Sequence, residues 1–163
     1  MAEAVGEIYS VDTSSLMDWQ ARHYPLGVFQ GLATRIDDLG TNRRLFAVAL
    51  VEEEVRAVGT GDMAKWFKDR RDLIVPTSEV LAEALAIQNQ FTGLRDPKAQ
   101  SEEADSYVIA LARMRNGIVV TQETSAAEKR NPKRTHFIPD VCRELGIPCI
   151  NLLGLMRRER WVF

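Results

Sequence analysis

The segment GIVVTQE, residues 117–123, begins with a β-branched run that is typical of a buried strand. Thr121 follows this run directly, and the carboxylate of Glu123 comes two residues later. A buried strand normally ends in turn residues rather than in a charge just beyond its last position. The segment therefore predicts a strand whose carboxyl end takes part in function, provided that other acidic residues occupy similar places in the chain.

Short strand-like runs alternate with helical patterns on both sides of this segment. The expected strands are residues 7–12, 45–50, 72–76, 117–121 and 146–151. The expected helices are residues 13–20, 29–39, 51–58, 62–71, 77–91, 101–116, 138–145 and 152–159. This alternation predicts an α/β fold with three layers, α/β/α, around a central, mainly parallel sheet. Active sites in such sheets form beyond the carboxyl ends of the strands.

Length and composition limit the possible classes of protein. A chain of 163 residues with 45% hydrophobic content predicts one compact domain over residues 1–163. The net charge of −2 is not that of a general nucleic-acid binder, so such a role must rest on local basic patches. Cys142 and Cys149 do not form a Cys-x-x-Cys pair and are interpreted as apolar fillers of a helix and a strand. Residues 1–7 lack a signal-peptide core and no apolar run approaches the ~20 residues of a membrane span, so we expect a cytoplasmic protein without a membrane partner.

Four carboxylates lie where elements should meet at one edge of the sheet. Asp12 ends the first expected strand, and Glu123 follows the strand of the opening segment. Glu54 lies in the first turns of the helix after the second strand, at the border of its buried face. Asp105 lies near the start of the helix that leads into the opening segment. Clustered carboxylates raise one another's pKa. A divalent cation removes this conflict, and all-oxygen sites suit Mg²⁺ or Mn²⁺.

A carboxylate-held cation at a sheet edge suits the hydrolysis of phosphodiesters. One ion generates hydroxide from water, and a second ion roughly 3.5–4 Å away stabilises the leaving oxygen. Thr121 and Ser14 are placed to hydrogen-bond a carboxylate or a phosphate. The sequence has no nucleophile elbow, P-loop, dinucleotide fingerprint or zinc-protease motif that would indicate another chemistry.

Each acidic residue also has a structural interpretation. Asp12 alone could cap the helix that follows it. Asp105 could interact only with the helix dipole, which is the role expected for Glu102 and Glu103 in the first turn of a helix beginning at residue 101. Asp140 is interpreted as an N-terminal helix residue rather than as a ligand. The functional interpretation is preferred for Asp12 and Asp105 because they belong to the set of four.

The second ligand is open between two glutamates of the same helix. A run of three glutamates is often a solvated helix face, and Glu53 is an alternative to Glu54. Glu52 and Glu53 are expected to point toward solvent, whereas the neighbours of Glu54 one turn away are apolar.

A basic segment, EKRNPKR at residues 128–134, follows the turn at Glu123. Its cations are Lys129, Arg130, Lys133 and Arg134. A solvated loop is the simplest interpretation, but its place beside the expected site favours contacts with phosphates of a nucleic acid. Trp19 and Trp66 are expected to be core or interface anchors, and the apolar end after residue 160 is expected to add an edge strand or to dock a partner.

The acidic motifs resemble those of a known family. YSVDTSSL, VEEEV, EADSYVIALA and GIVVTQE resemble, in this order, the four acidic motifs of PIN-domain ribonucleases, the fold of VapC-type toxins. The segments HYP and IPDVCRELGIPCINLL are similar to a longer PIN-like subgroup. The resemblance extends from about Ile8 to about Leu155.

The resemblance implies a ligand set and a function. It implies that Asp12, Glu54, Asp105 and Glu123 are the first to fourth ligands of Mg²⁺ or Mn²⁺. It also implies a single PIN-like domain that cleaves RNA as an endoribonuclease, is inhibited by a cognate antitoxin protein, and forms a homodimer. Many relatives have Thr-x-Asp where this chain has Thr-Gln-Glu, so the longer Glu123 is expected to reach the metal differently or through water.

Two other functions remain as alternatives. One is an inert PIN-like scaffold that only binds a partner, which the departure at Glu123 favours. The other is a receiver-like phosphoacceptor switch. That class needs an acceptor Asp at the end of a middle strand and a Lys at the end of a later one, where this chain has Pro76 and Asn151.

Overall fold

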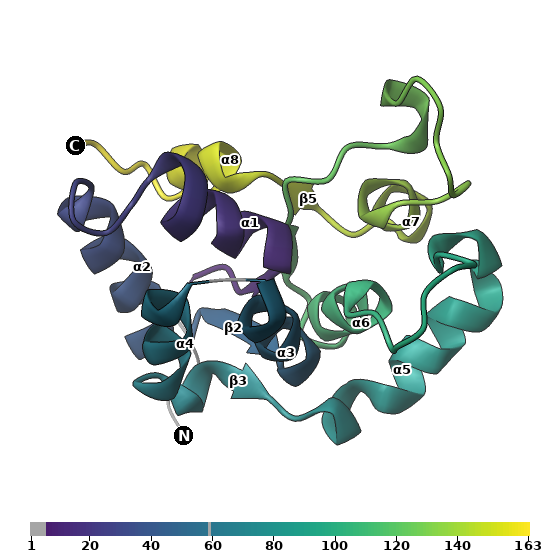
Figure 1. Cartoon of the computed structure of the whole chain (residues 1–163), viewed down its shortest axis with the longest axis horizontal. Coiled ribbons are helices and arrows are strands. Elements are labelled where there is room, and N and C mark those ends of the chain that lie inside the picture. Colours follow the sequence, from purple (N-terminus) through teal and green to yellow (C-terminus); the bar gives the residue numbers. More distant parts are fainter. Residues whose placement is uncertain (1–5, 59) are drawn as a thin grey trace.

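The computed structural model describes residues 6–58 and 60–163 and has a five-stranded sheet at its centre (Figure 1). The strands are β1 (Tyr9–Val11), β2 (Leu45–Val48), β3 (Ile74–Val75), β4 (Ile118–Val120) and β5 (Cys149–Ile150). The α-helices are α1 (Thr13–Met17), α2 (Gln30–Thr41), α3 (Ala49–Val58), α4 (Gly61–Lys68), α5 (Thr77–Gln90), α6 (Asp105–Met114), α7 (Ile138–Leu145) and α8 (Leu152–Arg158). Shorter helical turns are η1 (Asp18–His23), η2 (Arg71–Leu73), η3 (Thr92–Leu94) and η4 (Ala126–Glu128). Residues 1–7 were expected to lack a signal peptide, and residues 1–5 of this segment lie outside the described part.

The sheet is parallel, and its strand order is β3-β2-β1-β4-β5. The chain moves outward from β1 to β3 and then returns to β4 on the other side of β1, so the strand order reverses between β1 and β4. In parallel sheets, a crevice at the carboxyl ends of the strands is expected at such a reversal. Val11 pairs with Val120 in the last register position, so the residues that follow both strands meet at that crevice.

Helices cover both faces of the sheet, which confirms the predicted three-layer fold. On one face, Leu16 of α1, Ile36 of α2 and Leu155 of α8 line a small cavity together with Val11 and Val120. On the other face, α6 lies against β1, β2 and β4, and Figure 1 shows α5 on its outer side. The hydroxyl of Ser10 donates a hydrogen bond to the Val108 carbonyl oxygen (2.8 Å) and joins β1 to α6.

Packing explains why particular residues are needed in these elements. Gly117 allows β4 to begin close to β1, because a Cβ atom there would lie 2.7 Å from the carbonyl oxygen of Ile8. Trp19 and Trp66 are buried and meet edge to face with ring centroids 5.3 Å apart, which confirms their prediction as core anchors. Cys142 is buried in α7 and Cys149 is partly buried in β5, as expected for apolar fillers.

Among the predicted boundaries that differ from the structure, two concern the elements that carry acidic residues of the site. The strand predicted over residues 45–50 ends at Val48, and α3 begins at the next residue. Helix α6 begins at Asp105 rather than at residue 101, so Glu102 and Glu103 precede it. Glu103 instead accepts a hydrogen bond from the backbone N–H of Asp96 (3.0 Å), and Glu102 accepts one from the Tyr107 hydroxyl (3.0 Å). These hydrogen bonds of the two side chains accompany the loop that precedes α6.

The structure also corrects two expectations about surface residues. Glu52 does not point to solvent: it is 7% exposed and forms ion pairs with Arg71 and with Arg56 (3.5 Å). The chain end after α8 forms no strand within the described residues, so the expected edge strand is wrong. Among the helices of the described ranges, none is long and apolar enough to cross a membrane.

Candidate active site

Asp12 lies directly after β1, where the sheet order reverses between β1 and β4. Its side chain is 4% exposed, and its backbone N–H donates to the Val120 carbonyl oxygen (2.9 Å). The hydroxyls of Ser14 (2.8 Å) and Thr121 (2.9 Å) both donate to Oδ2 of Asp12. The first turn of α1 and the end of β4 thus orient one carboxylate oxygen from two sides.

The same hydroxyls also hold the turn after β4. Oγ of Ser14 accepts from the backbone N–H of Gln122 (3.0 Å), and Oγ1 of Thr121 accepts from the N–H of Glu123 (3.1 Å). Thr121 is buried, so its hydroxyl makes these bonds away from water. The threonine at the end of β4 therefore connects Asp12 with the backbone that carries Glu123.

Glu54 lies beside Asp12 and is held by two elements. Its Oε2 accepts from the hydroxyl of Thr13 (2.6 Å), and its Oε1 accepts from the backbone N–H of Ala104 (2.9 Å) at the start of α6. Glu53, the alternative second ligand, is exposed. Sequence reasoning missed Thr13, although its place between Asp12 and Ser14 could have indicated it.

Asp105 and Glu123 are bridged by Arg134. Nη1 of Arg134 donates to Oδ2 of Asp105 (3.0 Å), and Nη2 lies 3.4 Å from Oε1 of Glu123. The other Glu123 oxygen, Oε2, accepts from the backbone N–H of Ile138 in the first turn of α7 (3.1 Å). A helix N-terminus favours a negative charge at this position. The sequence alone did not place Arg134 among the carboxylates.

The four carboxylates influence one another electrostatically. Burial raises the pKa of Asp12, and the charge of Glu54 also raises it. The hydrogen bonds from Ser14 and Thr121 lower this pKa but do not cancel the rise. Burial, followed by the charges of Glu123 and Asp12, raises the pKa of Asp105 well above its usual range. Burial and the charge of Asp12 also raise the pKa of Glu123, although the Ile138 N–H and Arg134 oppose this effect. These carboxylates therefore belong to one site.

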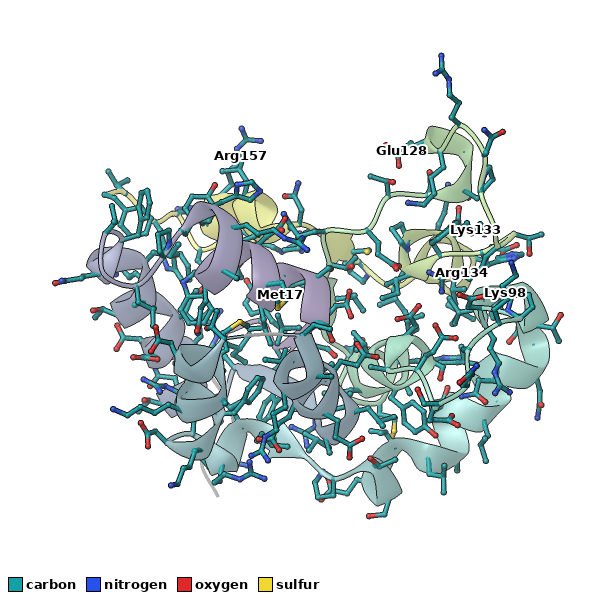
Figure 2. The ribbon with its side chains drawn as sticks, in the orientation of Figure 1. Met17, Lys98, Glu128, Lys133, Arg134 and Arg157 are labelled. Atoms are coloured by element: carbon teal, nitrogen blue, oxygen red, sulfur yellow. The ribbon has the colours of Figure 1, made fainter. Side chains whose placement is uncertain are left out.

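The basic segment has a mixed arrangement. Arg130 and Lys133 are exposed, whereas Lys129 donates to the Thr124 hydroxyl (2.9 Å) and lies over the Phe137 ring. Arg134 differs from the expectation of a solvated or phosphate-contacting cation, because its guanidinium is directed at carboxylates of the site. Figure 2 shows Lys133 and Arg134 on the loop before α7.

The donor set suits a hard divalent cation in its chemistry, since it consists of carboxylate oxygens without sulfur. In the conformation described for residues 6–58 and 60–163, however, no three acidic, histidine or cysteine side chains converge closely enough to hold a metal ion. The contacts explain this. Arg134 binds Asp105 and Glu123, and both Glu54 oxygens accept protein hydrogen bonds. Metal binding would require these side chains to exchange partners.

Asp140 is not part of this set. Its Oδ2 accepts from the backbone N–H groups of Ala126 (2.9 Å) and Phe137 (2.9 Å), which connects η4 to the first turn of α7. The prediction of an N-terminal helix residue is confirmed.

The fold and site define an α/β protein with a parallel sheet and an acidic centre beyond the carboxyl ends of its middle strands. The chain belongs to the family described as "Domain of unknown function (DUF4411)", whose model matches residues 9–163. The match includes all four carboxylates and Arg134. No curated protein matches the chain.

Proposed function

We propose that the protein is a Mg²⁺- or Mn²⁺-dependent endoribonuclease that hydrolyses RNA phosphodiester bonds. The observation that carries the proposal is the set of Asp12, Asp105 and Glu123 at the β1–β4 crevice. The pKa of each is raised by burial and by a carboxylate neighbour. Perturbed carboxylates gathered at the carboxyl ends of a parallel sheet's strands favour a functional site.

The proposed ligand roles follow from the resemblance to PIN-domain ribonucleases and require the side chains to exchange their present partners. Asp12, Glu54, Asp105 and Glu123 would hold the cation. Ser14 and Thr121 orient Asp12 through Oδ2, which reduces the freedom of the central ligand. A divalent cation in such a site supplies a nucleophile from water and stabilises negative charge on the phosphate.

RNA is the proposed substrate because a basic segment borders the site. Arg130 and Lys133 are exposed in the segment that follows Glu123 and are available for phosphate contacts, and the charge of Lys129 acts on Glu123. Such contacts make binding weaker as the salt concentration rises. We therefore assign Lys129, Arg130 and Lys133 to the RNA backbone.

The biological setting is a further part of the proposal. The ordered acidic motifs, similar to those of VapC-type PIN-domain toxins, support a cytoplasmic toxin with a cognate antitoxin. A homodimer is proposed because Val28 and Phe163 are 72% and 70% exposed and border an apolar groove of about 420 Å³. Sedimentation analysis tests the dimer, and a monomer at all concentrations contradicts it.

Cleavage of a labelled RNA panel by the purified protein tests the enzymatic proposal. We expect products with Mg²⁺ or Mn²⁺, no products with EDTA, and no products from Asp12→Asn. Asp38→Asn serves as the matched control because Asp38 is exposed near the end of α2. Equal cleavage by the wild type and Asp12→Asn contradicts the catalytic assignment.

An inert binding scaffold is the second candidate. The ion pairs of Arg134 with Asp105 and Glu123 favour it, because they compensate two carboxylates without a metal. Calorimetric titration with Mn²⁺ separates the two functions. The enzyme should bind Mn²⁺ in a way that requires Asp12, whereas the scaffold should not.

A further inference from the structure

We propose that Cys142 and Cys149 form a reversible intrachain disulfide that joins α7 to β5. They are the two cysteines of the sequence, and both are free thiols on elements that contact each other. Other small apolar side chains would fill the same space, but a pair of thiols also permits redox chemistry. The pair lies outside the carboxylate set, and its chemistry does not depend on the proposed nuclease activity.

The chain folds back sharply between the two cysteines. Helix α7 ends at Leu145, and Gly146 follows with a φ of 70°, a left-handed conformation that suits glycine. The backbone N–H of Ile147 then donates to the Cys142 carbonyl oxygen (2.8 Å). Cys149 comes two residues after this contact and begins β5. The turn therefore returns the chain to the part of the helix that carries Cys142.

Strand alternation directs the Cys149 side chain toward α7. A Cβ atom added at Gly154 of α8 would lie 3.1 Å from the Cβ atom of Ile150, so Ile150 faces α8. Successive side chains of a strand point to opposite faces of the sheet, so Cys149 faces the side on which α7 contacts β5 and α6. Figure 1 shows α7 and α8 on either side of β5. Cys142 belongs to the buried core of this side, and Cys149 packs against that core.

The two thiols also influence each other directly. A hydrogen bond with Cys149 is the largest cause that raises the pKa of the Cys142 thiol, and burial raises this pKa further. Such a hydrogen bond requires the two sulfur atoms to lie close together. Cys142 therefore stays protonated at neutral pH. Cys149 is only partly buried and lies on an edge strand, so it is the thiol that an oxidant reaches first.

Hydrogen peroxide is a two-electron oxidant that allows a balanced reaction. The Cys149 sulfur attacks one peroxide oxygen, the O–O bond breaks, and Cys149 becomes a sulfenic acid with release of water. The Cys142 sulfur then attacks the Cys149 sulfur. The S–S bond forms, the S–O bond breaks, and the hydroxyl leaves with the Cys142 proton as a second water. A small dithiol reduces the bond again by thiol–disulfide exchange.

The disulfide joins the two elements that hold the chain after β4. The backbone N–H of Ile138 in α7 donates to Glu123 (3.1 Å), and the carbonyl oxygen of Ile150 in β5 accepts from the backbone N–H of Thr121 (2.9 Å). Oxidation therefore restrains the turn between Thr121 and Glu123 from both sides. The loop closed by the bond also reduces the freedom of the unfolded chain, so the oxidised protein is the more stable form.

Peptide mapping of the folded full chain tests the disulfide. Trypsin cleaves after Arg143, between the two cysteines, so an intrachain bond links peptides 135–143 and 144–157. We expect this linked pair after treatment with hydrogen peroxide and alkylation of the remaining thiols. Dithiothreitol should release both peptides and lower the thermal midpoint of the oxidised protein by about 5–10 °C. Cys149→Ala, treated in the same way, is the control and should show neither effect.

Every other outcome overturns the proposal. Two separate alkylated peptides would show that the cysteines are only apolar fillers. Bonds that form only between chains, or a sulfinic acid at Cys149 without the linked pair, would show that Cys142 does not reach its partner. A midpoint that does not fall with dithiothreitol would show that the bond does not fix α7 to β5. Circular dichroism checks folding, and Cys142→Ala replaces Cys149→Ala if that variant does not fold. Because RNA cleavage is not measured, failure of the nuclease proposal leaves this result unaffected.

Discussion

Asp12 is an acidic side chain held in a place from which water is excluded. Two hydroxyls donate to one of its oxygens, and within the carboxylate set the nearest compensating cation, Arg134, is directed at other members. Burial is the largest cause of its raised pKa, so ionisation of Asp12 costs free energy in the metal-free fold. Such a cost in stability is expected where a residue is kept for its function rather than for its contribution to stability.

The stability of the metal-free protein should report this cost. Because the folded-state pKa of Asp12 is raised, the folded state binds the proton more tightly, and the penalty grows as the pH rises from about 4 through the folded pKa. Asp12→Asn removes the charge and keeps an acceptor for the hydroxyls. We expect it to be more stable than the wild type near neutral pH. Urea denaturation in EDTA across pH 5 to 8 measures the difference, which should shrink as the pH falls. A difference that grows toward low pH contradicts the assignment.

Helix α6 shows how an element is placed by contacts that lie outside it. Helix α6 begins at Asp105, directly after Ala104, whose backbone N–H donates to Glu54 of α3, and Glu103 accepts from the backbone N–H of Asp96. The sequence correctly predicted a helix leading into the opening segment, but it placed the start at residue 101. Local capping signals and tertiary partners compete at such boundaries. The capping signals can be recognised in the sequence, whereas the tertiary partners are known only from the folded structure.

Substitution of Glu54 tests this connection between α3 and α6. Glu54→Ala leaves the Ala104 N–H and the Thr13 hydroxyl without their acceptor, so we expect a loss of stability of about 1–3 kcal/mol. Glu53→Ala, on the exposed side of the same helix, should change stability by less than about 0.5 kcal/mol. Denaturation of both variants measures the effects, and faster hydrogen exchange of the Ala104 amide should accompany only the first. Equal effects of the two substitutions argue against a special role for Glu54.

At the scale of the whole molecule, the proposed metal binding would be coupled to folding. The ligands come from α3, α6 and the ends of β1 and β4, which lie far apart in the chain and meet only in the folded state. A cation that binds them therefore stabilises the folded state relative to the unfolded chain.

Thermal unfolding should reveal this coupling. At a concentration 100 times its dissociation constant, Mn²⁺ should add about 2.7 kcal/mol, which raises the midpoint by about 5–10 °C for a chain of this size. EDTA should reverse the rise, and Asp12→Asn should show none. A rise of the same size in Asp12→Asn contradicts a site centred on Asp12.

The sequence by itself determined the α/β alternation, the parallel sheet and the candidate carboxylates, because hydrophobic periodicity and residue order are local properties of the chain. The sequence did not decide between Glu54 and Glu53 as the second ligand. It predicted wrongly that Glu52 points toward solvent, and it predicted that Arg134 is a solvated or phosphate-contacting cation like the others of its loop. Only the tertiary structure directed Glu54 toward Thr13 and Ala104, buried Glu52 against Arg71, and placed Arg134 between Asp105 and Glu123. The partners of these side chains depend on which segments, distant in sequence, lie close together in the fold. Charged side chains pair according to their distance in space, which the sequence alone does not give.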